Sequence, residues 1–77
     1  MTIEEIWQFA YDPNTPTETL RALARHDDNQ VREVVAQNPN TPADVLVELS
    51  VDPYWEVRYS VASNPNTPLE VLTTLAI

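Results

Sequence analysis

The feature that most constrains this chain is a pentapeptide that recurs every 26 residues. The sequence reads DPNTP at residues 12–16 and NPNTP at residues 38–42 and 64–68. A fixed period between about 20 and 50 residues is typical of solenoids, in which similar units stack and each unit contacts its neighbours. The sequence therefore predicts a fold built from stacked units rather than a globule with unrelated parts.

The pentapeptide contains signals that end one helix and begin the next. A proline disfavours the helical conformation for the residue before it, so Asn38 and Asn64 are expected to end the preceding helices. Thr41 precedes Pro42, and this order predicts a threonine N-cap followed by proline at the first helical position. An acid three residues after each such threonine favours the positive end of the new helix.

Each unit contains two short segments with one apolar face. Leu20, Leu23 and Ala24 have the i, i+3, i+4 spacing of a helix, and similar residues recur 26 positions later. The second segment follows Asp52-Pro53, which we interpret as another cap-and-proline pair. Its residues from Val57 to Val61 suit one helical face, although they also alternate as in a strand. We favour a helix, in part tightened to 3₁₀, over a strand.

Residues 1–11 match the repeat poorly but still have a helical apolar stripe, and Thr2 with Glu5 offers a cap. Since the ends of a solenoid need a covering element, this segment is predicted to be an N-terminal capping helix. The predicted fold is all-α, a short α-solenoid forming a single domain. Its parts are the capping helix 1–11, repeat 12–37, repeat 38–63 and partial repeat 64–77.

Composition argues against several functional classes. The chain has no cysteine and no glycine, which excludes thiolate metal sites and disfavours the glycine-rich loops that bind phosphates. Twelve acids against four arginines give a net charge of −8, which disfavours nucleic acid as a partner. The acidic surface either serves solubility, the interpretation we favour, or suits a basic protein partner. No segment resembles a secretion signal or approaches the ~18 apolar residues of a membrane span, so a cytoplasmic protein is expected.

The string TPxxVLxxLxxDPxxEVRxxVAxNPNTP, best seen from Thr41 to Pro68, closely resembles the leucine-rich repeat variant family. The resemblance covers residues 12–77. It implies a right-handed superhelix of alternating α and 3₁₀ helices, no enzyme activity, and a role as a bacterial scaffold. Some members have a cysteine-bound iron–sulfur cluster, but this chain has no cysteine, so no cofactor is expected.

The chain is also similar to HEAT repeats, in which an acid six residues before an arginine contributes to a ladder between units. Asp52 and Arg58 have this spacing, whereas His26 takes the acid's place in the first unit, with Asp27 or Asp28 as substitutes. Repeated asparagines are expected to bond between turns. The residues predicted to form the structural ladder are Arg32, Asn40, Asp52, Arg58 and Asn66.

Aromatic residues that depart from the repeat are the candidates for partner binding. They either fill gaps between helices or act as anchors for a partner, because Trp and Tyr are over-represented among interface hot spots. The second interpretation predicts a non-enzymatic protein-interaction module with an acidic, aromatic-bearing surface. The partner-binding candidates are Trp7, Tyr54, Trp55 and Tyr59.

The alternative function is structural self-assembly. The chain stops midway through a unit, so Leu72, Leu75 and Ile77 are expected to be partly exposed and to favour a homodimer. An enzyme is not expected, because His26 is the sole histidine and no nucleophile is predicted beside it. No metal is expected either, since the Asp27-Asp28 pair lacks a glycine-turned calcium loop.

Overall fold

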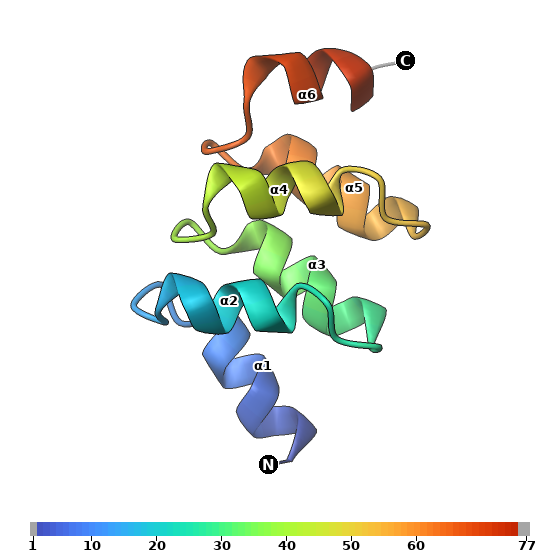
Figure 1. Ribbon diagram of the computed structural model, residues 1–77. Helices are drawn as coiled ribbons and strands as arrows, with labels where there is room; N and C mark the ends of the chain where they lie inside the picture. The colour runs from blue at the N-terminus through green and yellow to red at the C-terminus, as the bar shows by residue number, and fades with distance from the viewer. Residues whose placement is uncertain (1, 76–77) are drawn as a thin grey trace.

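The computed structural model describes residues 2–75, and in that range the chain forms α-helices and no strand. Figure 1 shows two columns of helices, with α2 and α4 on one side and α1, α3 and α5 on the other. The prediction of an all-α solenoid is confirmed, and the segment for which a strand was the alternative is helical. The elements are α1 (Ile3–Tyr11), α2 (Thr17–Leu23), α3 (Asn29–Gln37), α4 (Ala43–Leu49), α5 (Trp55–Ser63) and α6 (Leu69–Leu75).

The helix bounds repeat with the period of the sequence. Helices α1, α3 and α5 each have nine residues and start at Ile3, Asn29 and Trp55, 26 residues apart. Helix α1 therefore stands in the same phase as α3 and α5, although its sequence resembles theirs little. The 3₁₀ geometry implied by the family resemblance is not found in residues 2–75, because both segments of each unit are α-helical.

The hydrophobic core lies between the two columns. Leucines from α2 and α4 meet valines from α3 and α5, and their side chains are almost completely buried. Neither helix of a unit could bury its apolar face alone, so stacking supplies the core. The largest buried apolar side chains are Leu20, Leu46, Leu49, Val31, Val35, Val45, Val57 and Val61.

The predicted threonine cap is wrong for α4, and the same holds for α2. Each of these helices has a proline as its N-cap, with non-helical backbone and no side-chain cap bond. The hydroxyl of Thr41 is used elsewhere, since it donates to the carbonyl of Val35 at the end of α3 (2.6 Å). The threonine thus links the end of one helix to the start of the next. The capping box expected of Thr2 and Glu5 is present at α1.

Asp52-Pro53 is not a cap-and-proline pair. Helix α5 begins at Trp55, and its N-cap is Tyr54, which makes no side-chain cap bond. The Asp52 side chain instead accepts a hydrogen bond from the backbone N–H of Tyr54 (3.0 Å), which closes the turn before the helix. This turn leaves the other carboxylate oxygen of Asp52 available to the neighbouring unit.

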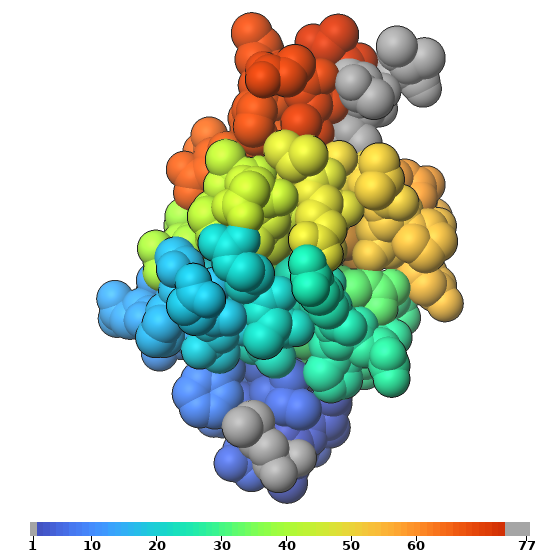
Figure 2. All heavy atoms as spheres, in the orientation of Figure 1, coloured from blue at the N-terminus to red at the C-terminus, as the bar shows by residue number. Residues whose placement is uncertain are grey.

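The stack is elongated, with extents of 37 × 22 × 15 Å. Its α2–α4 side forms a continuous surface in Figure 2. Helix α3 lies between α1 and α5 and packs against both. None of the helices described within residues 2–75 is long and apolar enough to cross a bilayer.

Candidate functional site

Two buried asparagines join successive units. The side-chain amide of Asn38 donates to the carbonyls of Ala10 (2.7 Å) and Asp12 (2.9 Å) in the preceding turn of the solenoid. Its oxygen accepts from the N–H of Asn40 (2.8 Å). Both donors and one acceptor lone pair are therefore satisfied, as a buried amide requires. Asn64 makes the equivalent bonds one unit later.

The asparagines nominated from the sequence also bond between turns, but from more exposed positions. Asn40 donates its side-chain N–H to the carbonyl of Thr15 (2.8 Å), and Asn66 donates to the carbonyl of Pro39. Each of the two NPNTP copies thus contributes two asparagines to the contact with the preceding part of the stack. From the sequence, Asn38 and Asn64 were expected only to end the preceding helices. Their role in bonding between units was not predicted, although the presence of asparagine in both NPNTP copies was a signal for it.

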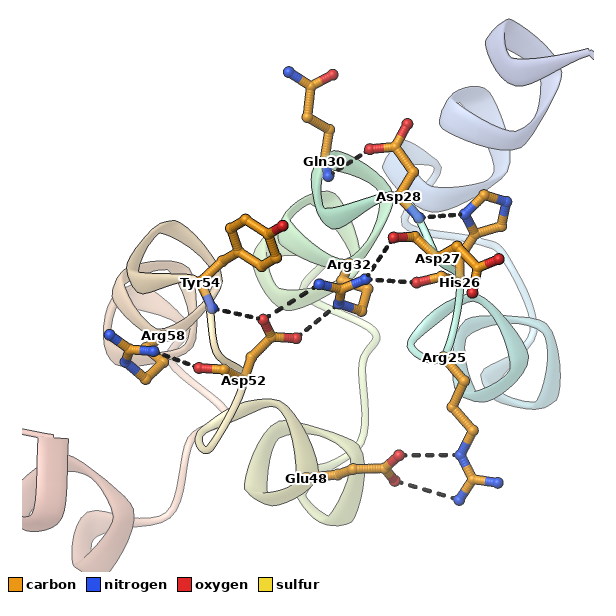
Figure 3. A network of polar contacts seen from close by, with 10 residues as sticks. All are labelled: Arg25, His26, Asp27, Asp28, Gln30, Arg32, Glu48, Asp52, Tyr54 and Arg58. Carbon is orange, nitrogen blue, oxygen red and sulfur yellow. Dashed lines mark hydrogen bonds and ion pairs between the residues drawn. The ribbon is translucent and has the colours of Figure 1, made fainter.

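Arg32 and Asp52 form the central ion pair between units (Figure 3). Arg32 Nε lies 2.7 Å from Asp52 Oδ2, and the two side chains are only 12% and 6% exposed. Arg32 Nη1 also donates to the carbonyls of His26 (2.7 Å) and Asp27 (3.0 Å). The acid that pairs with Arg32 therefore comes from the following unit, and neither the Asp27 nor the Asp28 carboxylate substitutes for it.

Arg58 continues this network through a backbone group. Its Nη1 donates to the carbonyl of Asp52, six residues earlier, as Arg32 does to the carbonyl of His26. His26 stands where the second unit has Asp52, and its Nδ1 accepts from the N–H of Asp28 (3.0 Å) just as Asp52 accepts from Tyr54. The imidazole thus replaces a carboxylate as the acceptor that closes the turn.

The electrostatics of the pair stabilise the charged form of Asp52. Burial raises the pKa of the Asp52 carboxyl, but the hydrogen bonds from Arg32 and the Tyr54 N–H outweigh burial, so the pKa lies below its ordinary value of 3.8. The hydrogen bond to Asp52 likewise raises the pKa of the Arg32 guanidinium. Both groups therefore remain ionised in the folded protein near neutral pH.

The other arginines pair with acids in the α2–α4 column. Arg21 contacts Asp44, and Arg25 Nε lies 3.0 Å from Glu48. The hydrogen bond from Arg21 lowers the pKa of Asp44. These pairs are more exposed than the pair of Arg32 and Asp52, so water screens them and each contributes little to stability.

The aromatic candidates are not gathered into one cluster. The ring of Tyr54 lies 5.6 Å from Arg32 Cζ, in a cation–π contact inside the inter-unit network. Trp55 and Tyr59 are on α5, 64% and 67% exposed. Trp7 is on α1, partly buried, and its Nε1 has no hydrogen-bond partner within the described part of the chain.

A shallow hollow brings Trp7 and Tyr11 of α1 beside Gln30, Glu33 and Val34 of α3. The sequence did not predict this hollow, because it depends on how α1 packs against α3.

Residues 2–75 contain no group of three potential ligands able to hold a metal ion. Of the self-association candidates, Leu72 is partly buried, whereas the Leu75 side chain and Ile77 lie outside what the structure describes.

Comparison with known proteins identifies related families over most of the chain. A family described as leucine-rich repeat variant domain matches residues 4–50, and a family described as leucine-rich repeat variant matches residues 55–76. The first match includes α1 as well as the first NPNTP copy. No curated protein and no solved structure matches the chain significantly.

Proposed function

Because the chain belongs to the leucine-rich repeat variant family, whose members are repeat scaffolds, we propose that it binds a basic segment of a protein partner. The proposed surface is the outward side of α1, α3 and α5, which we call the α1–α3–α5 face. Residues at three equivalent positions of each helix form it. They are Glu4, Trp7 and Tyr11 of α1, Gln30, Glu33 and Gln37 of α3, and Glu56, Tyr59 and Ser63 of α5.

The observation that carries this proposal is the separation of paired from unpaired carboxylates. The acids that form ion pairs with arginine are on α2, on α4 and in the turn before α5. On the α1–α3–α5 face, Glu4, Glu33 and Glu56 have no cationic partner among residues 2–75. Unpaired carboxylates on one face favour the approach of a positively charged partner and disfavour acidic ones.

Exposed aromatic rings on the same helices supply apolar anchors. Tyr11, Trp55 and Tyr59 are each at least 60% exposed, so their rings are available without unfolding the stack. Burying such rings on binding is worth more than most interface contacts. Nothing in this arrangement requires a catalytic group, which agrees with a scaffold that binds rather than transforms its partner.

The test starts with capture of partners from source cells on the immobilised chain and continues with titration calorimetry of each purified candidate. We expect Trp55→Ala and Tyr59→Ala each to weaken binding about tenfold or more, with the helical circular dichroism signal retained. Val51→Ala is the matched control, because Val51 is an exposed apolar residue outside α1, α3 and α5. A partner affinity that is unchanged by both aromatic substitutions, or that does not weaken as the salt concentration rises, would contradict the proposal.

Self-association is the second candidate function, and an exposed apolar residue on α6 favours it. Leu69, at the start of α6, is 76% exposed. Apolar surface of this kind promotes pairing of like copies. Sedimentation equilibrium should then give a dimer that Leu69→Ser weakens. A monomer at several hundred micromolar would contradict this alternative.

A further inference from the structure

The hollow between α1 and α3 has the chemistry of a site for one cationic side chain. We propose that it binds a single arginine of the partner segment, an inference that rests on the proposed function and names the group recognised. The hollow, which we call the α1/α3 hollow, is lined by Trp7, Tyr11, Gln30, Glu33 and Val34. Its volume is about 230 Å³, below the ~300–1,000 Å³ of sites for drug-sized ligands. This size suits one side chain.

The lining combines the groups that bind a guanidinium. Trp7 and Tyr11 provide aromatic rings, and cations are attracted to the faces of such rings. Glu33 provides a carboxylate that no arginine neutralises within residues 2–75, and Gln30 adds an amide. Val34 is almost fully buried and supplies an apolar floor. A planar guanidinium can stack on a ring while it donates to a carboxylate, which an ammonium does less well.

The protein already binds one of its own arginines in this way. Arg32 contacts both the Asp52 carboxylate, which lies 2.7 Å from its Nε, and the Tyr54 ring, whose centroid lies 5.6 Å from its Cζ (Figure 3). The α1/α3 hollow offers the same pair of groups, a carboxylate and an aromatic ring, with no arginine of residues 2–75 between them. An arginine from outside would complete the same arrangement.

Departures from the repeat explain why the contact between α1 and α3, the α1–α3 seam, differs from the contact between α3 and α5, the α3–α5 seam. At the α3–α5 seam, Gln37 Nε2 donates to Ser60 Oγ (3.2 Å) and bridges the two helices. The equivalent positions at the α1–α3 seam are Tyr11 and Val34, which cannot form such a bond. The seam is therefore not bridged there by hydrogen bonding.

A second hollow, beside Trp55 and Tyr59, does not fit a cation. It is lined also by Ala62 and by Arg58, which carries a positive charge. Like charges in one small hollow repel each other. The charges on α3 and α5 thus favour the α1/α3 hollow as the arginine site and leave Trp55 and Tyr59 as apolar anchors.

The test is an NMR titration of the full chain with N-acetyl-arginine methylamide, with the uncharged citrulline analogue as the matched probe. We expect saturable shifts of the Trp7 indole N–H and of the backbone amides of Gln30, Glu33 and Val34. Arginine should bind at least about fivefold more tightly than citrulline at low ionic strength. Equal binding of the two probes, or shifts centred on Trp55, would overturn the proposal.

Variants separate recognition in the hollow from the charge of the whole face. Glu33→Gln should weaken binding of the arginine probe about five- to tenfold, whereas Glu56→Gln removes the same charge from α5 and should change it less than twofold. Tyr11→Ala gives an independent check if Glu33→Gln does not fold, because Tyr11 is 60% exposed and contributes little to the core. Equal effects of Glu33→Gln and Glu56→Gln would show attraction by net charge only.

The partner titration distinguishes this inference from the proposed function. If a purified partner needs Trp55 and Tyr59 but is indifferent to Glu33→Gln and Tyr11→Ala, the interaction function stands and the arginine site fails. If the arginine probe occupies the α1/α3 hollow while every purified candidate ignores the aromatic changes on α5, the site stands and the proposed function fails.

Discussion

Asn64 repeats, one unit later, the hydrogen bonds that Asn38 makes. Asn38 donates to the carbonyls of Ala10 and Asp12, and Asn64 donates to those of Ala36 and Asn38, each 26 residues further along. Both side chains are at most 4% exposed. The same amide thus satisfies two carbonyls at each junction. The first asparagine of each NPNTP copy therefore holds neighbouring units together.

Asn38→Asp should destabilise the protein by about 3 kcal/mol or more, because a buried carboxylate would replace two donors and face two carbonyls. The chain contains its own control. Asp12 holds the equivalent position in the first copy, is exposed and accepts only from the N–H of Asn14 (2.9 Å). Asp12→Asn should therefore change stability by no more than about 0.5 kcal/mol. Urea unfolding followed by circular dichroism measures both, and similar losses would contradict this role for Asn38.

Arg32→Lys should cost about 1–3 kcal/mol, although the charge is kept. A lysine ammonium cannot reproduce donations from Nε to Asp52 and from Nη1 to two carbonyls. Arg25→Lys is the matched control, since the Arg25 side chain is 72% exposed and pairs only with Glu48. Its effect on stability should be much smaller than that of Arg32→Lys. Thermal unfolding of the two variants measures these changes in stability. An Arg32→Lys variant as stable as the original protein would mean that the several N–H donors of the guanidinium are not needed.

Stability should fall in acid because of Asp52. The pKa of Asp52 in the folded protein lies below its ordinary value of 3.8, so protons bind more tightly to the unfolded chain. The resulting stabilisation is present above about pH 4 and is lost as the pH falls through the lowered pKa. Asp52→Asn should be less stable at pH 7 and should lose less stability between pH 5 and pH 3. Urea midpoints across this range test the prediction, and parallel curves for the two proteins would refute it.

Thr41→Val should cost about 1 kcal/mol, because the variant keeps the shape of the side chain but removes a buried hydrogen bond. The carbonyl of Val35 then keeps only the N–H of Asn38 as a donor. Thr73→Val serves as the comparison. The hydroxyl of Thr73 also donates to a carbonyl, that of Leu69 (3.2 Å), but it does so on an exposed surface. Water can replace that bond, so the change should be near zero. Equal effects in chemical denaturation would mean that burial of the Thr41 bond has no consequence.

The fold could be predicted because the repeat carries most of the information. The spacing of Leu20 and Leu46 and the proline after Asn38 fix where helices start and stop, and stacking follows from their one-sided apolar faces. The phase of α1 could not be read in this way. Trp7 stands where the later helices have Glu33 and Tyr59, and few other positions keep their identity, the buried Ala10 and Ala36 among them. The equivalence therefore shows mainly in the backbone.

The contacts between units were harder to predict because each polar side chain has several local uses. Thr41 suits an N-cap, and only the approach of the Val35 carbonyl diverts its hydroxyl. The pairing of Arg32 with Asp52 joins residues 20 positions apart, whereas the spacing rule pointed to an acid six residues before the arginine. The α1/α3 hollow depends on side-chain packing between helices, which the periodicity of the sequence does not specify.

Bonds that reach only to the adjacent unit have a consequence for protein synthesis. The side-chain hydrogen bonds between units join residues 20 to 28 positions apart, from the pair Arg32–Asp52 to the pair Ala10–Asn38. As the chain leaves the ribosome, each new unit therefore finds its acceptors and ion-pair partners in the segment made just before it. The loops that must close are short and similar in length, which favours rapid folding. The stack can thus assemble in the order of translation, without waiting for the C-terminus to emerge.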